Sequence, residues 1–78
     1  MPRFFFHVEG LPDDEETDLP DLATAKCEAV RYAGRKVCDE AGNFWDTAEF
    51  SLIVTDEKGL ILFTLSFTGH EAPAISVR

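Results

Sequence analysis

Two cysteines and two histidines are the side chains of this chain that are best suited to nucleophilic, redox or metal chemistry. Cys27 and Cys38 lie eleven residues apart in one predicted helix. That spacing separates them by about 16 Å along the helix axis, whereas a disulfide needs Cα atoms within ~7 Å. They therefore cannot bridge each other or share a metal ion. We expect both to be small apolar residues at the border of the helix–sheet contact; the alternative is a redox-sensing or intermolecular thiol.

The histidines lack a catalytic partner in the local sequence. His7 alternates with apolar residues, so we expect a half-exposed strand histidine on the side of Phe5. The spacing between His7 and either cysteine gives no support for a nucleophile–base pair, and His70 lies outside any motif. No serine has the sequence context of a nucleophile elbow. We predict that the protein is not an enzyme and has no catalytic, cofactor-binding or metal-binding residues.

An acidic segment holds nearly all the excess charge of the chain. The net charge is -8, and residues 9–21 contain seven acidic residues and no basic one. They are Glu9, Asp13, Asp14, Glu15, Glu16, Asp18 and Asp21. Nucleic acids and anionic membranes require a basic surface, so this charge argues against both as partners.

Three interpretations of the acidic segment can be compared. A calcium loop starting at Asp14 would need Gly at its sixth position and Glu at its twelfth, where the chain has Leu19 and Ala25. Recognition of a basic protein partner is the second interpretation. Solvated acids placed before the positive end of a helix dipole are the third, and the favoured one. The candidate interaction residues here are Asp13, Asp14, Glu15, Glu16 and Asp18.

The only helical pattern in the chain covers about residues 21–40. Asp21 is a good N-cap for a helix that begins at Leu22. Apolar residues recur at helical spacing and predict one buried stripe. The stripe consists of Leu22, Ala25, Ala29, Val30, Ala33 and Val37. We expect Ala41, Gly42 and Asn43 to end the helix, with Gly42 or Asn43 left-handed, and the aromatic pair Phe44 and Trp45 to follow in a loop that closes the core.

Strand patterns flank the helix on both sides. Residues 3–8, 49–55 and 60–68 are predicted strands, and 15–18 is a candidate short edge strand. Asp56 to Gly59 is a tight-turn sequence with Gly where a positive φ is required. The fold class is α+β: a two-layer sandwich with one amphipathic helix on a three- to four-stranded, mainly antiparallel sheet. We expect a single domain over 1–78, with 69–78 as a loose tail or a marginal edge strand.

The sheet should have one covered and one open face. We expect the helix to cover the side bearing Phe4, Phe6, Val8, Phe63, Leu65 and Phe67, or its opposite. The other face would contain Phe5, Ile53, Leu60 and Leu62, an apolar mixture typical of an interface. Phe5, Ile53 and Leu62 are therefore further candidate interaction residues. The alternative is that the tail or the acidic segment folds over this face. A homodimer, formed through this face or a free strand edge, would help so small a chain to fold.

The opening Met1-Pro2-Arg3-Phe4-Phe5-Phe6 resembles that of a large family of short bacterial proteins of unknown function. Segments 14–22 and 45–67 resemble the same family, which implies one compact α+β domain and no mechanism. A fainter resemblance is to antitoxins of the HicB type, which also pass from strands through an acidic turn into an amphipathic helix. Those proteins often have an added DNA-binding segment that we do not find here.

The sequence thus predicts a non-enzymatic, dimeric protein-interaction or regulatory module. The alternatives are an antitoxin-like binder that holds a basic protein partner through segment 9–21, and a thiol-dependent sensor or small enzyme. The first eight residues are too short for a signal peptide, and no apolar run reaches the ~18 residues of a membrane span. We therefore expect a cytoplasmic location, with no cofactor, no nucleic acid and no membrane as a partner.

Overall fold

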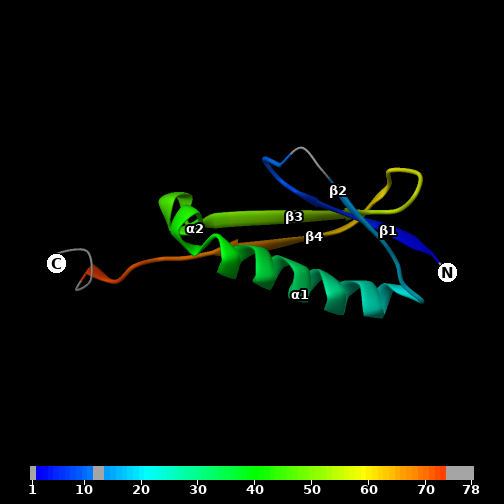
Figure 1. The fold of residues 1–78 in the computed structure, drawn as a ribbon, viewed down its shortest axis with the longest axis horizontal. Helices are drawn as coiled ribbons and strands as arrows, with labels where there is room; N and C mark the ends of the chain where they lie inside the picture. The colour runs from blue at the N-terminus through cyan, green and yellow to red at the C-terminus, as the bar shows by residue number, and fades with distance from the viewer. Residues whose placement is uncertain (1, 12–13, 74–78) are drawn as a thin grey trace.

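A four-stranded antiparallel sheet with a long helix on one face is the fold of this protein (Figure 1). The computed structural model describes residues 2–11 and 14–73. The elements, in chain order, are β1 (Arg3–Val8), β2 (Asp14–Asp18), α1 (Leu22–Asp39), α2 (Ala41–Thr47), β3 (Glu49–Thr55) and β4 (Ile61–Thr68). The predicted α+β fold class and the predicted strands are confirmed, including the short acidic edge strand.

β1 lies inside the sheet because both of its faces are apolar. The strand order is β2-β1-β3-β4, and β1 pairs with β2 on one side and β3 on the other. Phe4 and Phe6 point to the helix side and are buried, whereas Phe5 points to the opposite face and is half-buried. An interior strand with aromatic side chains on both faces agrees with the prediction from three consecutive phenylalanines.

α1 begins where the sequence predicts, at a cap made by Asp21. The Asp21 backbone is extended, and its Oδ1 accepts a hydrogen bond from the Thr24 backbone N–H at 2.8 Å. This bond satisfies one of the free donors of the first turn.

The buried face of α1 is narrower than predicted. Ala25, Ala29 and Ala33 are completely buried, but Leu22 is 44% and Val30 is 54% exposed. Around the axis, Val30 lies about 100° from Ala29, which places it on the flank. Leu22 is the first residue of α1 and is likewise exposed, so neither belongs to the buried stripe as predicted.

The core combines small helix residues with large sheet residues. Three alanines on α1 let the helix approach the sheet closely, and aromatic and branched side chains from the strands fill the remaining space. The buried members from the sheet are Phe4, Phe6, Val8, Leu52 and Val54; Phe50, Phe63, Leu65 and Phe67 pack against them. The predicted helix-covered face is confirmed.

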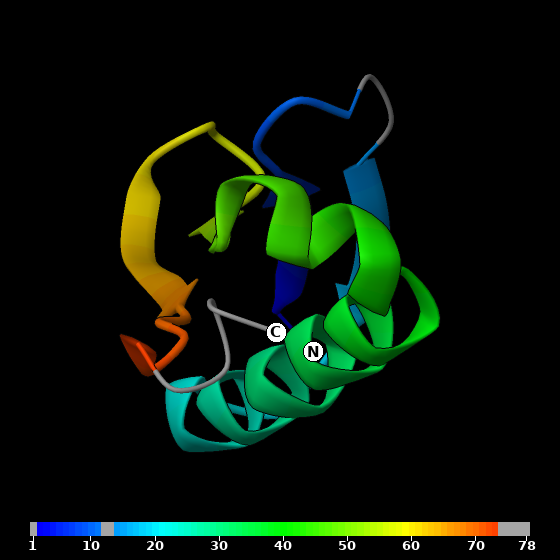
Figure 2. The ribbon, with the colours of Figure 1, turned by 90° about the vertical axis from the view of Figure 1, so that its left-hand side faces the viewer.

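A second helix replaces the predicted loop after α1. The helical conformation is interrupted only at Glu40, and α2 then continues to Thr47. The prediction that Ala41, Gly42 and Asn43 end the helical region is therefore wrong. The left-handed residue is Ala48 (φ 57°), not Gly42 or Asn43. Phe44 and Trp45 therefore stand on α2, at the end of the sheet where β3 begins (Figure 2).

The aromatic pair on α2 packs against the end of β4. The rings of Phe44 and Trp45 meet edge to face with centroids 5.4 Å apart. A Cβ at Gly69 would lie 2.8 Å from the Trp45 ring, so only glycine allows this approach. The Gly69 backbone N–H also donates to the Ala48 carbonyl at 3.0 Å. Tertiary packing of two aromatics thus explains a helix that local propensity did not indicate.

The turn between β3 and β4 follows the prediction. Gly59 has φ 83°, and its N–H donates to the Asp56 carbonyl at 3.1 Å. The Asp56 carboxylate accepts further bonds from the backbone N–H groups of Lys58 and Leu60. This side-chain turn fixes the hairpin locally.

An irregularity in the hairpin changes which residues face outward. The register shifts between Val54 and Thr55, so that Thr55 is opposite Ile61 while Val54 is opposite Phe63. Leu62 is the extra residue and packs against the core rather than on the open face, where it was predicted. Ile61 takes the outward position and is 58% exposed. In the tail, residues 69–72 add no strand, and the rest of the segment lies largely outside the described residues.

Candidate interaction surfaces

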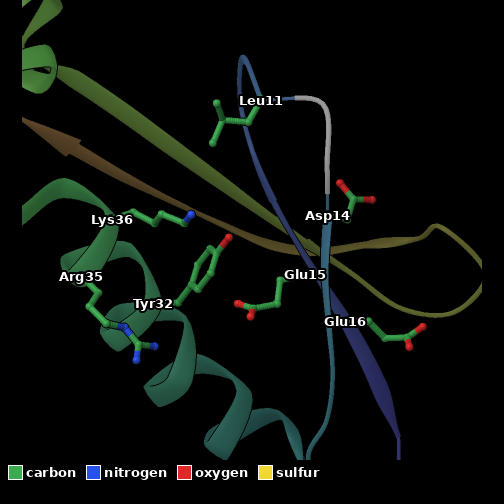
Figure 3. A pocket seen from close by; sticks show the side chains of 7 residues that line it. All are labelled: Leu11, Asp14, Glu15, Glu16, Tyr32, Arg35 and Lys36. Carbon is green, nitrogen blue, oxygen red and sulfur yellow. The ribbon is translucent and has the colours of Figure 1, made fainter. Parts of the chain in front are cut away.

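A groove runs between the acidic edge strand β2 and helix α1 (Figure 3). Its volume is about 670 Å³. The lining residues are Leu11, Asp14, Glu15, Glu16, Tyr32, Arg35 and Lys36. The strand wall is acidic and the helix wall is basic, so the groove can hold an occupant that carries charges of both signs.

The carboxylates of β2 are divided between its two faces. In the register with β1, Asp14, Glu16 and Asp18 are opposite His7, Phe5 and Arg3 on the open face of the sheet. Glu15 is opposite Phe6 and therefore belongs to the helix side. In Figure 3 the Glu15 side chain extends toward Tyr32, and Glu16 extends away from it.

Two residues of β1, Arg3 and His7, contact the open-face acids. The Arg3 guanidinium lies 3.3 Å from Asp18 and 3.6 Å from Glu16. The hydrogen bond to Asp18, reinforced by the charge of Glu16, raises the pKa of Arg3. His7 Nδ1 is hydrogen-bonded to Asp14 Oδ1. All five side chains are more than a third exposed to solvent, so these pairs add little stability.

Tyr32 lies on the helix wall of the groove. Its ring packs on Phe6, with centroids 5.4 Å apart, and the Lys36 Nζ lies 5.7 Å from the ring centroid. Burial raises the pKa of Tyr32, and the nearby negative charge of Glu15 acts in the same direction. The ring therefore connects the groove to the core and holds Lys36 beside it.

The open face of the sheet is mixed in character. Phe5 and Ile53 are half-buried there, as predicted, together with His7. Leu60 is 63% exposed in the hairpin, beside the outward-facing Ile61. No described helix covers this face (Figure 1), so its apolar side chains form an exposed patch.

The two edges of the sheet differ sharply in charge. β2 carries four carboxylates in five residues. β4, at the other edge, has eight residues with no charged side chain, no proline and no glycine. No described strand pairs with its outer edge, which is drawn at the side of the molecule in Figure 2. Such an edge offers unpaired backbone donors and acceptors to another strand.

The thiols lie away from these surfaces and from the core. Cys27 and Cys38 are unbonded, as predicted, but both are exposed. Their expected place at the border of the helix–sheet contact is wrong, because at 100° per residue Cys27 lies about 160° from Ala29 around the axis. Within residues 2–11 and 14–73, no group of three or more His, Cys, Asp or Glu side chains could hold a metal ion.

The structure brings some of the predicted site residues together and separates others. Asp14, Glu15 and Glu16 line one groove, whereas Asp18 lies at the far end of β2 and Asp13 lies outside the described residues. Phe5 and Ile53 share the open face, and Leu62 does not.

Sequence reasoning missed the helix wall of the groove. Tyr32 follows Ala25 by seven residues and Ala29 by three, which is the spacing of the buried stripe. The sequence could therefore have predicted its inward position. No sequence pattern marked Arg35 and Lys36 as site residues. Their place opposite β2 depends on how the sheet and helix pack, which local patterns do not reveal.

None of the helices in the described part of the chain is both long and apolar enough to cross a membrane.

Comparison with known proteins gives one match. A search of curated proteins and a search of solved structures found none. Residues 3–68 match the sequence profile of the family described as a domain of unknown function, DUF6894, a span that includes every strand and helix above. The match agrees with the expected family of uncharacterised proteins. The chain therefore belongs to the DUF6894 family.

Proposed function

We propose that this protein is a non-enzymatic interaction module that forms a homodimer by pairing the β4 edges of two copies. The observation that carries the proposal is the eight-residue uncharged edge of β4. Natural sheets usually protect a free edge with charge, proline or a covering element. β2 has such protection in its acids, and β4 has none among the described residues.

The geometry favours the second copy as the occupant of this edge. Two β4 strands related by a twofold axis would pair antiparallel and extend the sheet without bringing like charges together. Pairing through β2 would instead oppose carboxylates with carboxylates. The exposed Ile61 and Leu60 lie at one end of β4 and would lose solvent contact in the paired sheet.

The test is molar mass measured by light scattering over a concentration series. We expect the mass to rise from 8.7 kDa toward twice that value as concentration increases. Thr64 is exposed on β4, so Thr64→Lys would place two positive charges near the twofold axis and weaken the dimer by roughly tenfold or more.

The matched control is Ala23→Lys at an exposed position of α1, which adds the same charge on an element outside the β4 edge and should leave the dimer unchanged. A constant mass of 8.7 kDa at high concentration would overturn the proposal. An equal loss of dimer in both lysine variants would also overturn the proposal, because the loss would then come from the added net charge and not from edge pairing.

A second candidate function is favoured by the groove. An antitoxin-like role, in which the acidic segment holds a basic protein partner, fits a strand whose carboxylates line a groove of about 670 Å³. Its test is binding of a labelled oligolysine, compared with oligoglutamate, at low and high salt. Preferential binding of oligolysine that weakens with salt supports this function, and equal binding of the two contradicts it.

The structure lends less support to a thiol-dependent function. Cys27 and Cys38 are exposed on the side of α1 away from the sheet, and neither lines the groove.

A further inference from the structure

The groove beside β2 combines three features that a docked strand requires. The outer edge of β2 is not paired with any described strand, so backbone donors and acceptors face outward along it. α1 runs beside this edge and forms the opposite wall. The space between them, about 670 Å³, is of the size that short ligand segments occupy in proteins.

A strand placed in the groove would meet different charges on its two faces. A strand added to β2 would direct alternate side chains to the open face and to the helix side. On the open face they would meet Asp14, Glu16 and Asp18, three carboxylates that share one guanidinium and one imidazole.

On the helix side the same strand would meet a mixed wall. Glu15 and Tyr32 lie nearer β2, and the cations of α1 lie beyond them. In Figure 3 the Lys36 ammonium extends into the groove above the Tyr32 ring. An occupant therefore needs a negative group on this side, close to Lys36, and small apolar side chains against Tyr32.

We propose that the groove between β2 and α1 binds an extended segment of a partner protein, added to the β2 edge as a further strand. The segment presents basic side chains to Asp14, Glu16 and Asp18 and an acidic side chain to Lys36. This inference rests on the second candidate function, capture of a basic partner, and names its site and its geometry.

Other occupants fit the walls less well. A second β2 would oppose its own carboxylates, and β4 of another copy has no basic side chain to offer. Nucleic acid would meet a chain of net charge -8. An extended segment uses the free backbone groups of the edge, which a helical segment cannot pair with.

The probe is the labelled peptide Lys-Val-Lys-Glu-Lys-Val-Lys with blocked ends, followed by fluorescence anisotropy. Its matched control, Lys-Lys-Val-Glu-Val-Lys-Lys, has the same composition and charge, but as a strand it places lysines on both faces, two beside the valines and two beside the glutamate. We expect the probe to bind roughly five- to tenfold more tightly than the control, because only the probe separates its charges by face.

A charge exchange tests the helix wall. Lys36→Glu should weaken the probe by roughly fivefold and strengthen a peptide in which the central glutamate is replaced by lysine. Lys26→Glu, at an exposed position of α1 that does not line the groove, makes the same change in net charge and should leave the preference unaltered.

Nuclear magnetic resonance locates the binding. Tyr32 is the only tyrosine of the chain, so its ring signals are unambiguous. On addition of the probe, the signals of Tyr32 and of residues 14–18 should shift, while those of β4 stay in place.

The outcomes separate this inference from the function on which it rests. If oligolysine binds but the probe is not preferred to its control, or if the shifts fall on β4, the groove inference is wrong and the basic-partner function stands. If neither oligolysine nor the probe binds, both are wrong. The groove inference would also be wrong if Lys36→Glu changed neither the affinity for the probe nor the affinity for the peptide with a central lysine.

Discussion

Asp21 shows how one side chain sets the start of the only long helix in the described chain. Its carboxylate accepts the Thr24 N–H, and this bond lowers the pKa of Asp21. Because the folded pKa is depressed, the bond contributes stability above the unfolded pKa, and that contribution is lost as pH falls through the folded pKa. Two other features also depend on single residues. Tyr32 and Lys36 line the helix wall of the groove, and Gly69, which has no side chain, permits the contact with Trp45.

We predict that Asp21→Ala destabilises the protein at neutral pH, because the first turn loses its cap. Asp21→Asn should retain the bond to Thr24 and lose the acid dependence, since an amide oxygen accepts without titrating. Chemical denaturation of the two variants and the parent over an acid pH series measures this. If the difference in stability between the parent and Asp21→Asn did not change with pH, the carboxylate of Asp21 would not be the titrating cap.

At the scale of elements, the junction between α2 and β3 depends on an unusual residue. Ala48 adopts the left-handed conformation (φ 57°), donates to the Phe44 carbonyl and accepts from Gly69. This conformation costs an L-residue about 1–2 kcal/mol. The junction persists because Phe44 and Trp45 pack against the end of β4 and determine where α2 must lie.

We predict that Ala48→Gly stabilises the protein by about 0.5–1 kcal/mol. The left-handed cost disappears, and the greater chain entropy of glycine offsets part of the gain. Gly59→Ala is the matched reverse change in the β3–β4 turn, where φ is 83°, and should destabilise by about 1 kcal/mol. Urea denaturation measures both. A less stable Ala48→Gly variant would show that the conformation carries no strain.

At the scale of the molecule, one alanine face of α1 and one aromatic face of the sheet form the whole described core. The close approach of α1 leaves its Tyr32 side beside β2, which creates the groove, and leaves the other sheet face without a described helix. Core packing thus determines the position of both candidate surfaces.

We predict that Ala29→Leu destabilises the protein by about 1–3 kcal/mol, since a completely buried alanine has no space for three more carbon atoms. Ala23→Leu, the same substitution on the exposed side of α1, should change stability by less than about 0.5 kcal/mol. Thermal or urea unfolding measures the pair. Equal stability of the two variants would mean that α1 is not closely packed on the sheet.

The sequence by itself determined the features that depend on neighbouring residues. Alternation predicted the hairpin of β3 and β4, and a run of apolar residues predicted β1. Asp21 predicted the start of α1 and Gly59 the hairpin turn, because each depends on local backbone preference or periodicity. It also identified Asp14, Glu15 and Glu16 as one charged segment.

Only the tertiary structure decided features that depend on contacts between distant segments. α2 forms because Phe44 and Trp45 meet Gly69, and Leu62 turns inward because the hairpin register shifts at Val54. Lys36 and Tyr32 face β2 because the alanines of α1 seat the helix on the sheet. These features result from packing between distant segments, and a local sequence pattern carries no information about the surface that its residues will contact.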